Sequence, residues 1–538
     1  MSVHPAAASF QLKDYLAAHE RKSLLRFITC GSVDDGKSTL IGRLLYESKR
    51  LFDDQLATLE RDSRKHGRQG GGIDFALLVD GLASEREQGI TIDVAYRFFS
   101  TDRRTFIVAD TPGHEQYTRN MATGASTADV AILLIDARKG IMRQTRRHAL
   151  LVSMLGIRHV ALAINKMDLV EWSEERFKQI GAEFRAFAVN LGFKQVTAIP
   201  LSALHGDNVV EPSAQATWYR GPTLLSYLET VAIEQTAEDE PFRLPIQWVN
   251  RPNPDFRGFA GLVASGRIRP GDRVRVLPSG LETSVARIVT MDGELDEAVP
   301  GQSVTLTLSD EVDISRGDVI TSVERQPQVS DRIEARLFWM ATEHLKEGDQ
   351  FLLKLGAAAV PAKVVTVRQR IDLASLASVP VSSLAANDVG HVVLLLDQPI
   401  AFDPYTESRR TGGFILIDRE SFDTAAIGLV DGAGSGRAAG SPPPPNDGQV
   451  TWLKAVREQK RRSVLKAMSW RVIGSVATVA AAFVLTQDTR LAAAIGATEV
   501  VTKLVLYYGH ERLWTHIKFG LSIAAKQRGT DPQSSGAG

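Results

Sequence analysis

The stretch Leu24-Leu-Arg-Phe-Ile-Thr-Cys-Gly-Ser-Val-Asp-Asp-Gly-Lys-Ser38 decides the fold at the start of this chain. Its apolar first half predicts a buried strand, Gly31–Ser38 matches the pattern G-x-x-x-x-G-K-[ST], and Thr39-Leu-Ile predicts the opening of a helix. Strand, loop and helix in this order form a P-loop, whose backbone N–H groups surround the phosphates of a nucleotide. A chance match in an ordinary turn is the alternative, and it does not explain the strand and the helix on either side.

The last two residues of this loop have separate predicted roles. Lys37 carries a positive charge toward the β and γ phosphate oxygens, and the hydroxyl of Ser38 is a ligand for Mg²⁺. The predicted phosphate-binding residues are Gly31, Ser32, Val33, Asp34, Asp35, Gly36, Lys37 and Ser38.

A second motif, Asp110-Thr111-Pro112-Gly113, follows the apolar run Phe106–Ala109. Its aspartate is predicted to face the magnesium ion through water, and the N–H of Gly113 to meet the γ-phosphate. Such a sequence is also common in an ordinary turn after a strand. Its position, about seventy residues after the P-loop and at a second strand end, favours the functional interpretation, because open α/β sheets bind ligands at the carboxyl ends of their strands.

A third motif, Asn165-Lys166-Met167-Asp168, follows the apolar run Val160–Ile164. A carboxylate accepts two parallel hydrogen bonds from guanine N1–H and the 2-amino group, which adenine does not offer, so Asp168 predicts selection of GTP over ATP. Ser202-Ala203-Leu204 follows a further strand candidate and is predicted to present backbone N–H groups to guanine O6. The Ser-Ala pair has weight only because it follows the other motifs in order.

Two residues complete the predicted hydrolysis site. Thr91 lies in the polar stretch Glu85–Ile92 and is predicted to complete the Mg²⁺ shell and to sense the γ-phosphate. His114, directly after Gly113, is predicted to orient the attacking water, with simple solvation of a surface histidine as the alternative. The catalytic candidates are therefore Lys37, Thr91 and His114, and the metal candidates are Ser38 and Thr91.

The rest of the chain predicts a multidomain α/β and β protein. Continuous apolar runs separated by helical segments indicate a mostly parallel sheet, and the later short alternating strands indicate two antiparallel β-barrels. The expected organisation is an N-terminal extension at 1–23, a P-loop GTPase domain at 24–232, β-barrels at 241–326 and 329–428, a Gly/Pro-rich linker at 431–450 and a basic two-helix segment at 451–528.

Composition narrows the function classes. Among 538 residues, 63 Lys and Arg balance 63 Asp and Glu, and Cys30 is the one cysteine, which excludes an internal disulfide and favours the cytoplasm. Residues 451–538 carry 13 basic and 5 acidic residues, a net of +8, so residues 1–450 have a net charge of −8. The negative charge of residues 1–450 disfavours nucleic acid as a partner. It therefore disfavours the main alternative function, a GTPase that delivers tRNA or acts on the ribosome.

The C-terminal segment contains two apolar stretches, 467–485 and 491–508, each close to the length of about 20 residues that spans a bilayer. Basic clusters before the first and after the second predict that both ends lie on the cytoplasmic side of the inner membrane. A tether at 467–508, and with it a membrane-bound regulatory GTPase, is one interpretation. A soluble hairpin packed on a partner is the other, because Glu499 and Lys503 are costly inside a bilayer.

The ordered motifs, followed by two barrels, resemble the translation-factor class of P-loop GTPases over about residues 24–428. Within that class the chain resembles the GTPase (large) subunits of bacterial sulfate adenylyltransferase, in the stretches Gly31–Tyr46, Glu85–Phe99 and Asp110–Met121. Elongation factors typically carry histidine at the position of Asp35, so this residue favours the sulfate branch. The C-terminal segment resembles a family of short two-helix predicted membrane domains.

The resemblance implies that GTP hydrolysis drives ATP and sulfate to adenosine 5′-phosphosulfate and pyrophosphate. It implies adenylyl transfer on a small catalytic partner subunit, GTP and Mg²⁺ as cofactors, and no nucleic acid. The sequence contains neither an S-G-G-x-D-S nor an H-x-G-H motif, as expected if adenylyl transfer takes place on another chain. The sulfate–phosphate anhydride is strongly uphill from ATP, and a conformational switch that depends on γ-phosphate occupancy can drive its formation.

Overall fold

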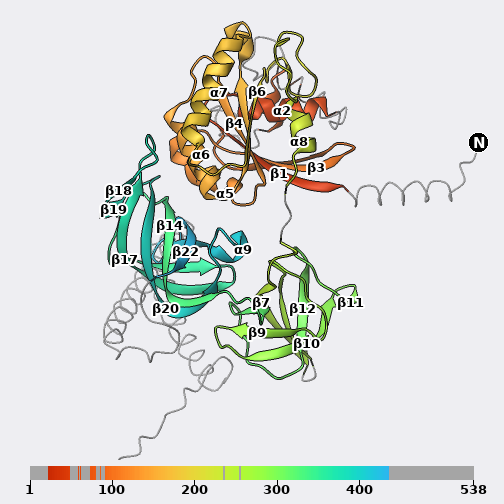
Figure 1. The fold of residues 1–538 in the computed structure, drawn as a ribbon, viewed down its shortest axis with the longest axis vertical. Coiled ribbons are helices and arrows are strands. Elements are labelled where there is room, and N and C mark those ends of the chain that lie inside the picture. The colour runs from red at the N-terminus through yellow and green to blue at the C-terminus, as the bar shows by residue number, and fades with distance from the viewer. Residues whose placement is uncertain are drawn as a thin grey trace, which may run out of the picture. The chain divides into compact units, whose positions relative to one another are not determined.

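The computed structural model describes residues 22–48, 73–79, 91–233, 237–253 and 256–434, together with Leu59, Arg61, Ser63 and Glu85 (Figure 1). Nearly all of the N-terminal extension expected at 1–23, most of the linker expected at 431–450 and the whole segment 451–528 lie outside the described residues. In the part of the chain that is described, no helix is both long and apolar enough to cross a bilayer.

The N-terminal domain is built on a six-stranded sheet with the order β2-β3-β1-β4-β5-β6. Strands β1, β3, β4, β5 and β6 are parallel, and β2 pairs antiparallel with β3 at the edge, which confirms the expected mostly parallel sheet. The strands are β1 (Ser23–Cys30), β2 (Ala95–Ser100), β3 (Arg104–Asp110), β4 (Val130–Asp136), β5 (His159–Asn165) and β6 (Gln195–Pro200).

Helices cover both faces of this sheet (Figure 1). One core cluster joins the sheet to α5 (Thr118–Ala125), α6 (Arg143–Met154) and α7 (Glu174–Ala188), and another joins it to α2 (Lys37–Glu47) and α8 (Leu224–Thr230). Short 3-10 turns come after α2, β3 and β5 in the chain: η1 (Phe75–Leu78), η2 (Glu115–Tyr117) and η3 (Met167–Val170), respectively. Every residue of β4 is buried, as expected for a central strand between two helical layers.

Two local features differ from the sequence prediction. Helix α2 begins at Lys37, two residues before the predicted start at Thr39, because Gly36 adopts a left-handed conformation and turns the chain directly into the helix. Strand β2 was not predicted. Its residues alternate between partly buried and exposed, as an edge strand does, and it lacks the continuous apolar run that identified the other strands.

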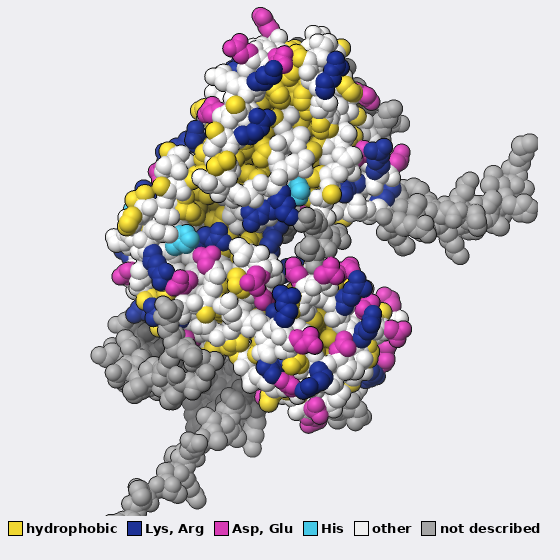
Figure 2. All heavy atoms as spheres, viewed as in Figure 1, with side chains coloured by type: hydrophobic (Ala, Val, Ile, Leu, Met, Phe, Trp, Pro, Cys, Tyr) yellow, Lys and Arg dark blue, Asp and Glu magenta, His cyan; other side chains and the backbone are white. Residues whose placement is uncertain are grey.

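Two antiparallel barrels follow, as expected. The first has the order β11-β10-β12-β8-β7-β13-β9 and closes where β9 pairs with β10. Its strands are β7 (Arg243–Asn253), β8 (Phe256–Leu262), β9 (Arg273–Leu277), β10 (Glu282–Thr290), β11 (Gly293–Leu295), β12 (Ser303–Leu308) and β13 (Val319–Ser322). Figure 2 shows acidic and basic side chains interspersed on the visible face of this barrel rather than a basic stripe. Pairs such as Arg287 and Glu294, 3.0 Å apart, account for part of this mixed surface.

The second barrel has the order β16-β21-β22-β14-β20-β17-β18 and closes where β16 pairs with β17. Its elements are β14 (Gln328–Trp339), β16 (Gln350–Leu355), β17 (Ala358–Ile371), β18 (Ser378–Pro380), β20 (Val389–Phe402), β21 (Gly413–Asp418), β22 (Thr424–Ala433), the short pair β15 (Leu345–Lys346) and β19 (Ser383–Leu384), and the single turn α9 (Arg409–Gly412). Each barrel encloses its own apolar cluster.

The end of the second barrel corrects one predicted boundary. The linker was expected to begin at residue 431, directly after a barrel ending at 428, but β22 continues to Ala433. Gly432 and Ala433 pair with Glu334 and Ile333 of β14 beyond a register shift, and Arg336 forms an ion pair of 2.8 Å with Asp431. Backbone pairing therefore extends the strand into a segment whose composition indicates a flexible linker.

Candidate functional site

The P-loop connects β1 to α2 at the carboxyl edge of the sheet. Gly36 has φ 92°, and a Cβ on it would lie 2.5 Å from Asn165 Nδ2, so both its backbone angle and its surroundings require glycine. No side chain among the described residues caps α2, which leaves its first N–H groups available to an anion. Uncapped amides and the helix dipole at the start of a helix suit an anion such as phosphate, as predicted for this loop.

Lys37 lies buried inside this loop, with 7% of its surface exposed. Its ammonium group donates to the carbonyl oxygens of Gly31, at 3.2 Å, and Ser32, at 2.9 Å. Burial lowers the pKa of Lys37, and the nearby carboxylates of Asp110 and Asp35 oppose that shift. A Cβ on Gly113 would lie 2.5 Å from Lys37 Nζ, so the two phosphate motifs meet at the lysine.

Three hydroxyl groups and one carboxylate converge in the loop that holds Lys37. Ser38 Oγ donates to Asp110 Oδ2 at 2.7 Å and lies 3.3 Å from Thr91 Oγ1. Thr29, from inside β1, donates to the other oxygen of Asp110 at 3.0 Å. Burial raises the pKa of Asp110, while the hydrogen bond from Ser38 and the charge of Lys37 lower it. The structure thus brings together Ser38, Thr91 and Asp110, which the sequence predicted for magnesium.

The donor set at this corner is suited to a hard cation. Mg²⁺ prefers oxygen ligands and usually keeps several waters and substrate phosphate oxygens in its shell. Ser38, Thr91 and Asp110 supply two hydroxyls and one carboxylate. Across the described ranges no group of three or more His, Cys, Asp or Glu residues is placed to hold a metal by itself.

The base-binding motif is connected directly to the P-loop by Asn165, at the end of β5. Its amide nitrogen donates to the Asp35 carbonyl at 2.7 Å. Its amide oxygen accepts from the backbone N–H groups of Ala203, at 2.9 Å, and Lys166, at 2.8 Å. The side chain of Asn165 is 2% exposed and joins the phosphate loop to two base-binding segments.

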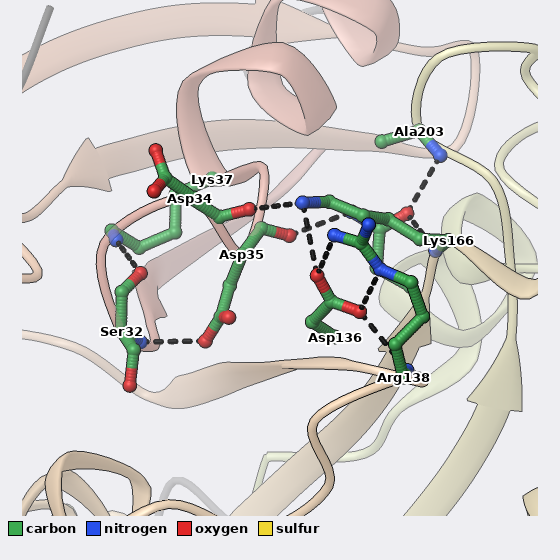
Figure 3. A network of polar contacts seen from close by, with 9 residues as sticks. Ser32, Asp34, Asp35, Lys37, Asp136, Arg138, Lys166 and Ala203 are labelled. Carbon is green, nitrogen blue, oxygen red and sulfur yellow. Dashed lines mark hydrogen bonds and ion pairs between the residues drawn. The ribbon is translucent and has the colours of Figure 1, made fainter. Parts of the chain in front are cut away.

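Figure 3 shows the Asp136 carboxylate between the side chains of Lys166 and Arg138. The ion-pair distances are 3.1 Å from Lys166 Nζ and 2.6 Å from Arg138 to Asp136 Oδ2. Burial acts to raise the pKa of Asp136, but hydrogen bonds from Arg138 and Lys166 outweigh it and hold the pKa well below its usual range. Lys166 also donates to the Asp34 carbonyl. This network fixes the Lys166 side chain between Asp136 and the P-loop.

The remaining base-binding candidates lie at the same edge. Met167 is fully buried, and the Asp168 side chain is 20% exposed, with Oδ2 3.8 Å from His205 Nε2. Ser202 is buried, and its N–H donates to the Asp207 carbonyl at 3.2 Å. Since the N–H of Ala203 donates to Asn165, both predicted guanine O6 donors already have partners. Their contact with guanine remains a prediction.

His114 lies apart from the other candidates. Its side chain is exposed, and Nδ1 accepts from the N–H of Gln116 at 3.3 Å, which caps the turn η2. The motif before it is buried from Asp110 to Gly113, and Thr111 donates to the Thr29 carbonyl at 2.5 Å. The structure therefore places the predicted water-orienting histidine at the exposed end of a rigid segment.

Sequence reasoning missed three supporting residues: Thr29, Asp136 and His148. Asp136 ends β4 just as Asp110 ends β3 and Asn165 ends β5, so the strand-end rule would have identified it. Thr29 and His148 lie inside a strand and a helix, where no motif marks them. His148 is fully buried and accepts from the N–H of Gly31 at 3.1 Å.

Asp35 makes the stability of the P-loop dependent on pH. Its carboxylate accepts from the N–H of Ser32 at 2.6 Å, and burial raises its pKa from 3.8 to about 6, with Lys37 opposing the rise. Since the folded-state pKa exceeds the unfolded one, the stabilising contribution is full below about pH 4 and is lost as the pH rises through about 6.

Asp35→Asn keeps the acceptor for Ser32 and removes this titration. We expect the variant to be more stable than wild type at pH 7.5 by about 2 kcal/mol, or roughly 4–8 °C in the melting temperature of the GTPase domain, and by less at pH 5. Thermal unfolding of the nucleotide-free chain at both pH values measures this. Equal differences at pH 5 and pH 7.5 would show that Asp35 does not titrate as proposed.

Four family models match the chain. Residues 22–234 match the elongation factor Tu GTP binding domain, 260–321 match elongation factor Tu domain 2, and 332–431 match a GTP-eEF1A C-terminal domain-like model. Residues 464–515, outside the described part of the chain, match a family described as a predicted membrane protein. The first three matches confirm the expected GTPase domain and two barrels, and they make GTP the nucleotide of this site.

Relatives with high identity cover most of the chain. Sulfate adenylyltransferase subunit 1 of Methylorubrum extorquens is 61% identical over 430 residues, 80% of this chain and 92% of the relative. The protein of the same name from Aeromonas hydrophila is 55% identical over 428 residues, 80% of this chain and 90% of the relative. Bifunctional enzyme NodQ of a Rhizobium species is 56% identical over 78% of this chain and 65% of its own length. A structure of sup35 complexed with GMPPNP matches 77% of this chain and 95% of its own at 24% identity with a TM-score of 0.35, too low to support an inference.

Proposed function

This chain belongs to the family of sulfate adenylyltransferase subunit 1, and we propose that its GTP hydrolysis drives ATP and sulfate to adenosine 5′-phosphosulfate and pyrophosphate. The chain is the GTP-binding subunit of this enzyme of sulfate assimilation, and it works with a partner subunit in a hetero-oligomer. We propose that the partner is a small catalytic subunit on which the adenylyl transfer takes place.

The observation that carries the proposal is the corner formed by Lys37, Ser38, Thr91 and Asp110. Lys37 is buried and donates to P-loop carbonyls, the start of α2 has no side-chain cap, and Ser38 Oγ lies within hydrogen-bond distance of both Asp110 and Thr91. Such a corner suits a triphosphate with its metal ion, where positioning and charge neutralisation supply most of the rate enhancement.

We assign the direct magnesium contacts to Ser38 and Thr91, and to Asp110 a contact through water. Bound Mg²⁺ would neutralise charge on the β and γ phosphate oxygens. The Asp110 carboxylate is held by Thr29 on one oxygen and by Ser38 on the other, so it is fixed before the nucleotide binds. Thr91 arrives from a separate segment, and its contact with Ser38 is where γ-phosphate occupancy changes the local structure.

We assign guanine recognition to Asp168, which is near the surface and whose oxygens can accept both guanine donors. Asn165 positions this side of the site rather than acting alone, because both ends of its amide are engaged. Lys166 and Met167 complete the base side: the lysine is held over the base by Asp136, and the methionine is packed in the core.

For hydrolysis, we assign His114 to orientation of the attacking water and Lys37 to stabilisation of charge on the transferred phosphoryl group. His114 directly follows Gly113, whose N–H we assign to the γ-phosphate. Glycine at position 113 permits the close approach of Lys37, since any side chain there would meet its ammonium group.

Coupling between the two subunits then has a physical basis. Forming the sulfate–phosphate anhydride costs more free energy than adenylyl transfer from ATP supplies, so a second hydrolysis must be linked to it. A segment whose order depends on the γ-phosphate can change a shared interface when GTP is cleaved.

The purified full-length chain should therefore hydrolyse GTP in preference to ATP, and its rate of GTP hydrolysis should rise when the partner subunit, ATP and sulfate are added. A rate that these three additions leave unchanged would contradict the coupling.

We propose in addition that residues 467–508 contact the inner membrane from the cytoplasmic side. The support is their apolar sequence and the match of residues 464–515 to a predicted membrane protein family. The full-length chain should sediment with membranes and resist carbonate extraction, whereas a chain ending at residue 450 should remain in the supernatant. Recovery of the full-length chain in the supernatant without detergent would contradict this tether.

A further inference from the structure

Helix α6 carries an ion pair to the turn that holds His114. Arg147 NH2 lies 2.7 Å from Glu115 Oε1, and Glu115 is the first residue of η2, directly after His114. The Arg147 side chain is 5% exposed and that of Glu115 is 55% exposed, so a buried cation meets a carboxylate at the surface. The hydrogen bond from Arg147 lowers the pKa of Glu115 and keeps the carboxylate ionised.

The buried guanidinium depends on this contact. Arg147 NH1 donates to Gln144 Oε1 at 2.9 Å, while its Nε is a buried atom with no hydrogen-bond partner within the described residues. Among the described residues, the carboxylate that forms an ion pair with Arg147 is that of Glu115. Loss of Glu115 would leave a buried charge without compensation, so the arginine would move or draw in water.

The same face of α6 also reaches the P-loop. His148 accepts the Gly31 N–H through Nδ1, and burial, with the charges of Lys37 and Arg147, lowers its pKa to about 3. The ring is therefore neutral and carries its proton on Nε2, which lies 2.9 Å from Gln144 Nε2. His148 Nε2–H and the Arg147 guanidinium are then both donors directed at the Gln144 amide. The single amide oxygen of Gln144 can accept from only one of them at a time, and here it accepts from Arg147.

Helix α6 itself is a fixed frame for these contacts. Its residues Ala149, Leu151 and Val152 are at most 1% exposed and belong to the core between the sheet and the helices. Consecutive polar groups on one side of this helix therefore hold Gly31 of the P-loop and Glu115 of η2 at a set separation. The exposed His114 makes contacts within its own turn: Nδ1 accepts from the N–H of Gln116 and its carbonyl accepts from the N–H of Tyr117. Its position therefore depends on how that turn is anchored.

We propose that Arg147 is a positioning residue for GTP hydrolysis, which sets the place of His114 by holding Glu115 against the helix that also holds the P-loop. This inference rests on the proposed function, because it concerns the histidine assigned to the attacking water. Glu115 lies two residues after Gly113, the end of the predicted γ-phosphate motif. When that motif shifts on GTP cleavage, the ion pair between Glu115 and Arg147 would limit the displacement of His114.

Three variants of the full-length chain, assayed with its partner subunit, test the proposal: Glu115→Ala, Arg147→Gln and the double variant. Single-turnover GTP hydrolysis and the dissociation constants for GTP and GDP are measured for each. We expect Glu115→Ala to slow hydrolysis about tenfold while both dissociation constants stay within about twofold of wild type. The double variant should lose no more than the larger of the two single losses, because both remove the same contact.

Glu183→Ala is the matched control. Glu183 lies on α7 rather than on η2, and it pairs at 3.4 Å with Arg146, the neighbour of Arg147 on α6. Its replacement should leave hydrolysis and binding unchanged. Hydrolysis by Glu115→Ala within twofold of wild type would overturn the proposal, as would additive losses in the double variant. Absence of hydrolysis by the wild-type chain would instead contradict the proposed function, so the two failures are distinguishable.

Discussion

Asp168→Asn is expected to lower the affinity for GTP about 10³-fold, because two charge-assisted hydrogen bonds to guanine are lost together. The same change should raise the affinity for xanthosine triphosphate, whose 2-oxygen can accept from the new amide. The surroundings favour a clean result: the Asp168 side chain is 20% exposed, and its Oδ2 lies 3.8 Å from Nε2 of His205. Competition binding with both nucleotides measures the exchange.

Glu174→Gln is the control for this change. Glu174 is a nearby acidic residue on α7 that is 44% exposed and paired with Lys178. Its replacement should leave affinity for both nucleotides unchanged. Unaltered GTP affinity of Asp168→Asn would refute the assignment of this carboxylate to guanine.

Lys37→Met is expected to lower the rate of GTP hydrolysis about 10³-fold, because it removes the charge aimed at the transferred phosphoryl group. In the free chain Lys37 donates to two P-loop carbonyls, so the variant also loses contacts that keep the loop closed. Methionine preserves most of the buried apolar stem. Single-turnover hydrolysis at saturating GTP separates the loss in rate from any loss in binding.

Lys178→Met provides the comparison, because that lysine is 69% exposed on α7 and pairs only with Glu174 among the described residues. It should hydrolyse GTP at the wild-type rate. A Lys37→Met variant that retains more than a tenth of the wild-type rate would show that the buried lysine has a structural role and does not act on the phosphates.

The sequence predicts the GTPase domain well where the signal is continuous. Strands β1, β3, β4 and β5 coincide with apolar runs because a parallel strand buried on both faces must be apolar throughout. Strand β2 escapes this rule because it lies at the edge of the sheet and only alternate residues face the core. The early start of α2 depends on the left-handed Gly36, a backbone angle that the pattern does not specify.

The site shows the same division. Motif residues at strand ends are brought together because the carboxyl ends of parallel strands share one edge. No such rule identifies the supporting residues that lie inside a strand or a helix. Thr29 lies inside β1 and His148 inside α6, and their roles follow only from their tertiary neighbours. His114 was predicted from its place after Gly113, but its exposed position and the ion pair between Arg147 and Glu115 of η2 appear only in the structure.

The measurement that tests the central claim most directly is pyrophosphate release by the purified full-length chain together with its partner subunit. With ATP and sulfate present, we expect release to require GTP and to cease with a non-hydrolysable GTP analogue. With Asp168→Asn, xanthosine triphosphate should restore the activity that GTP no longer supports. Release at the same rate without GTP, or with the analogue in its place, would contradict the claim that GTP hydrolysis on this chain drives sulfate activation.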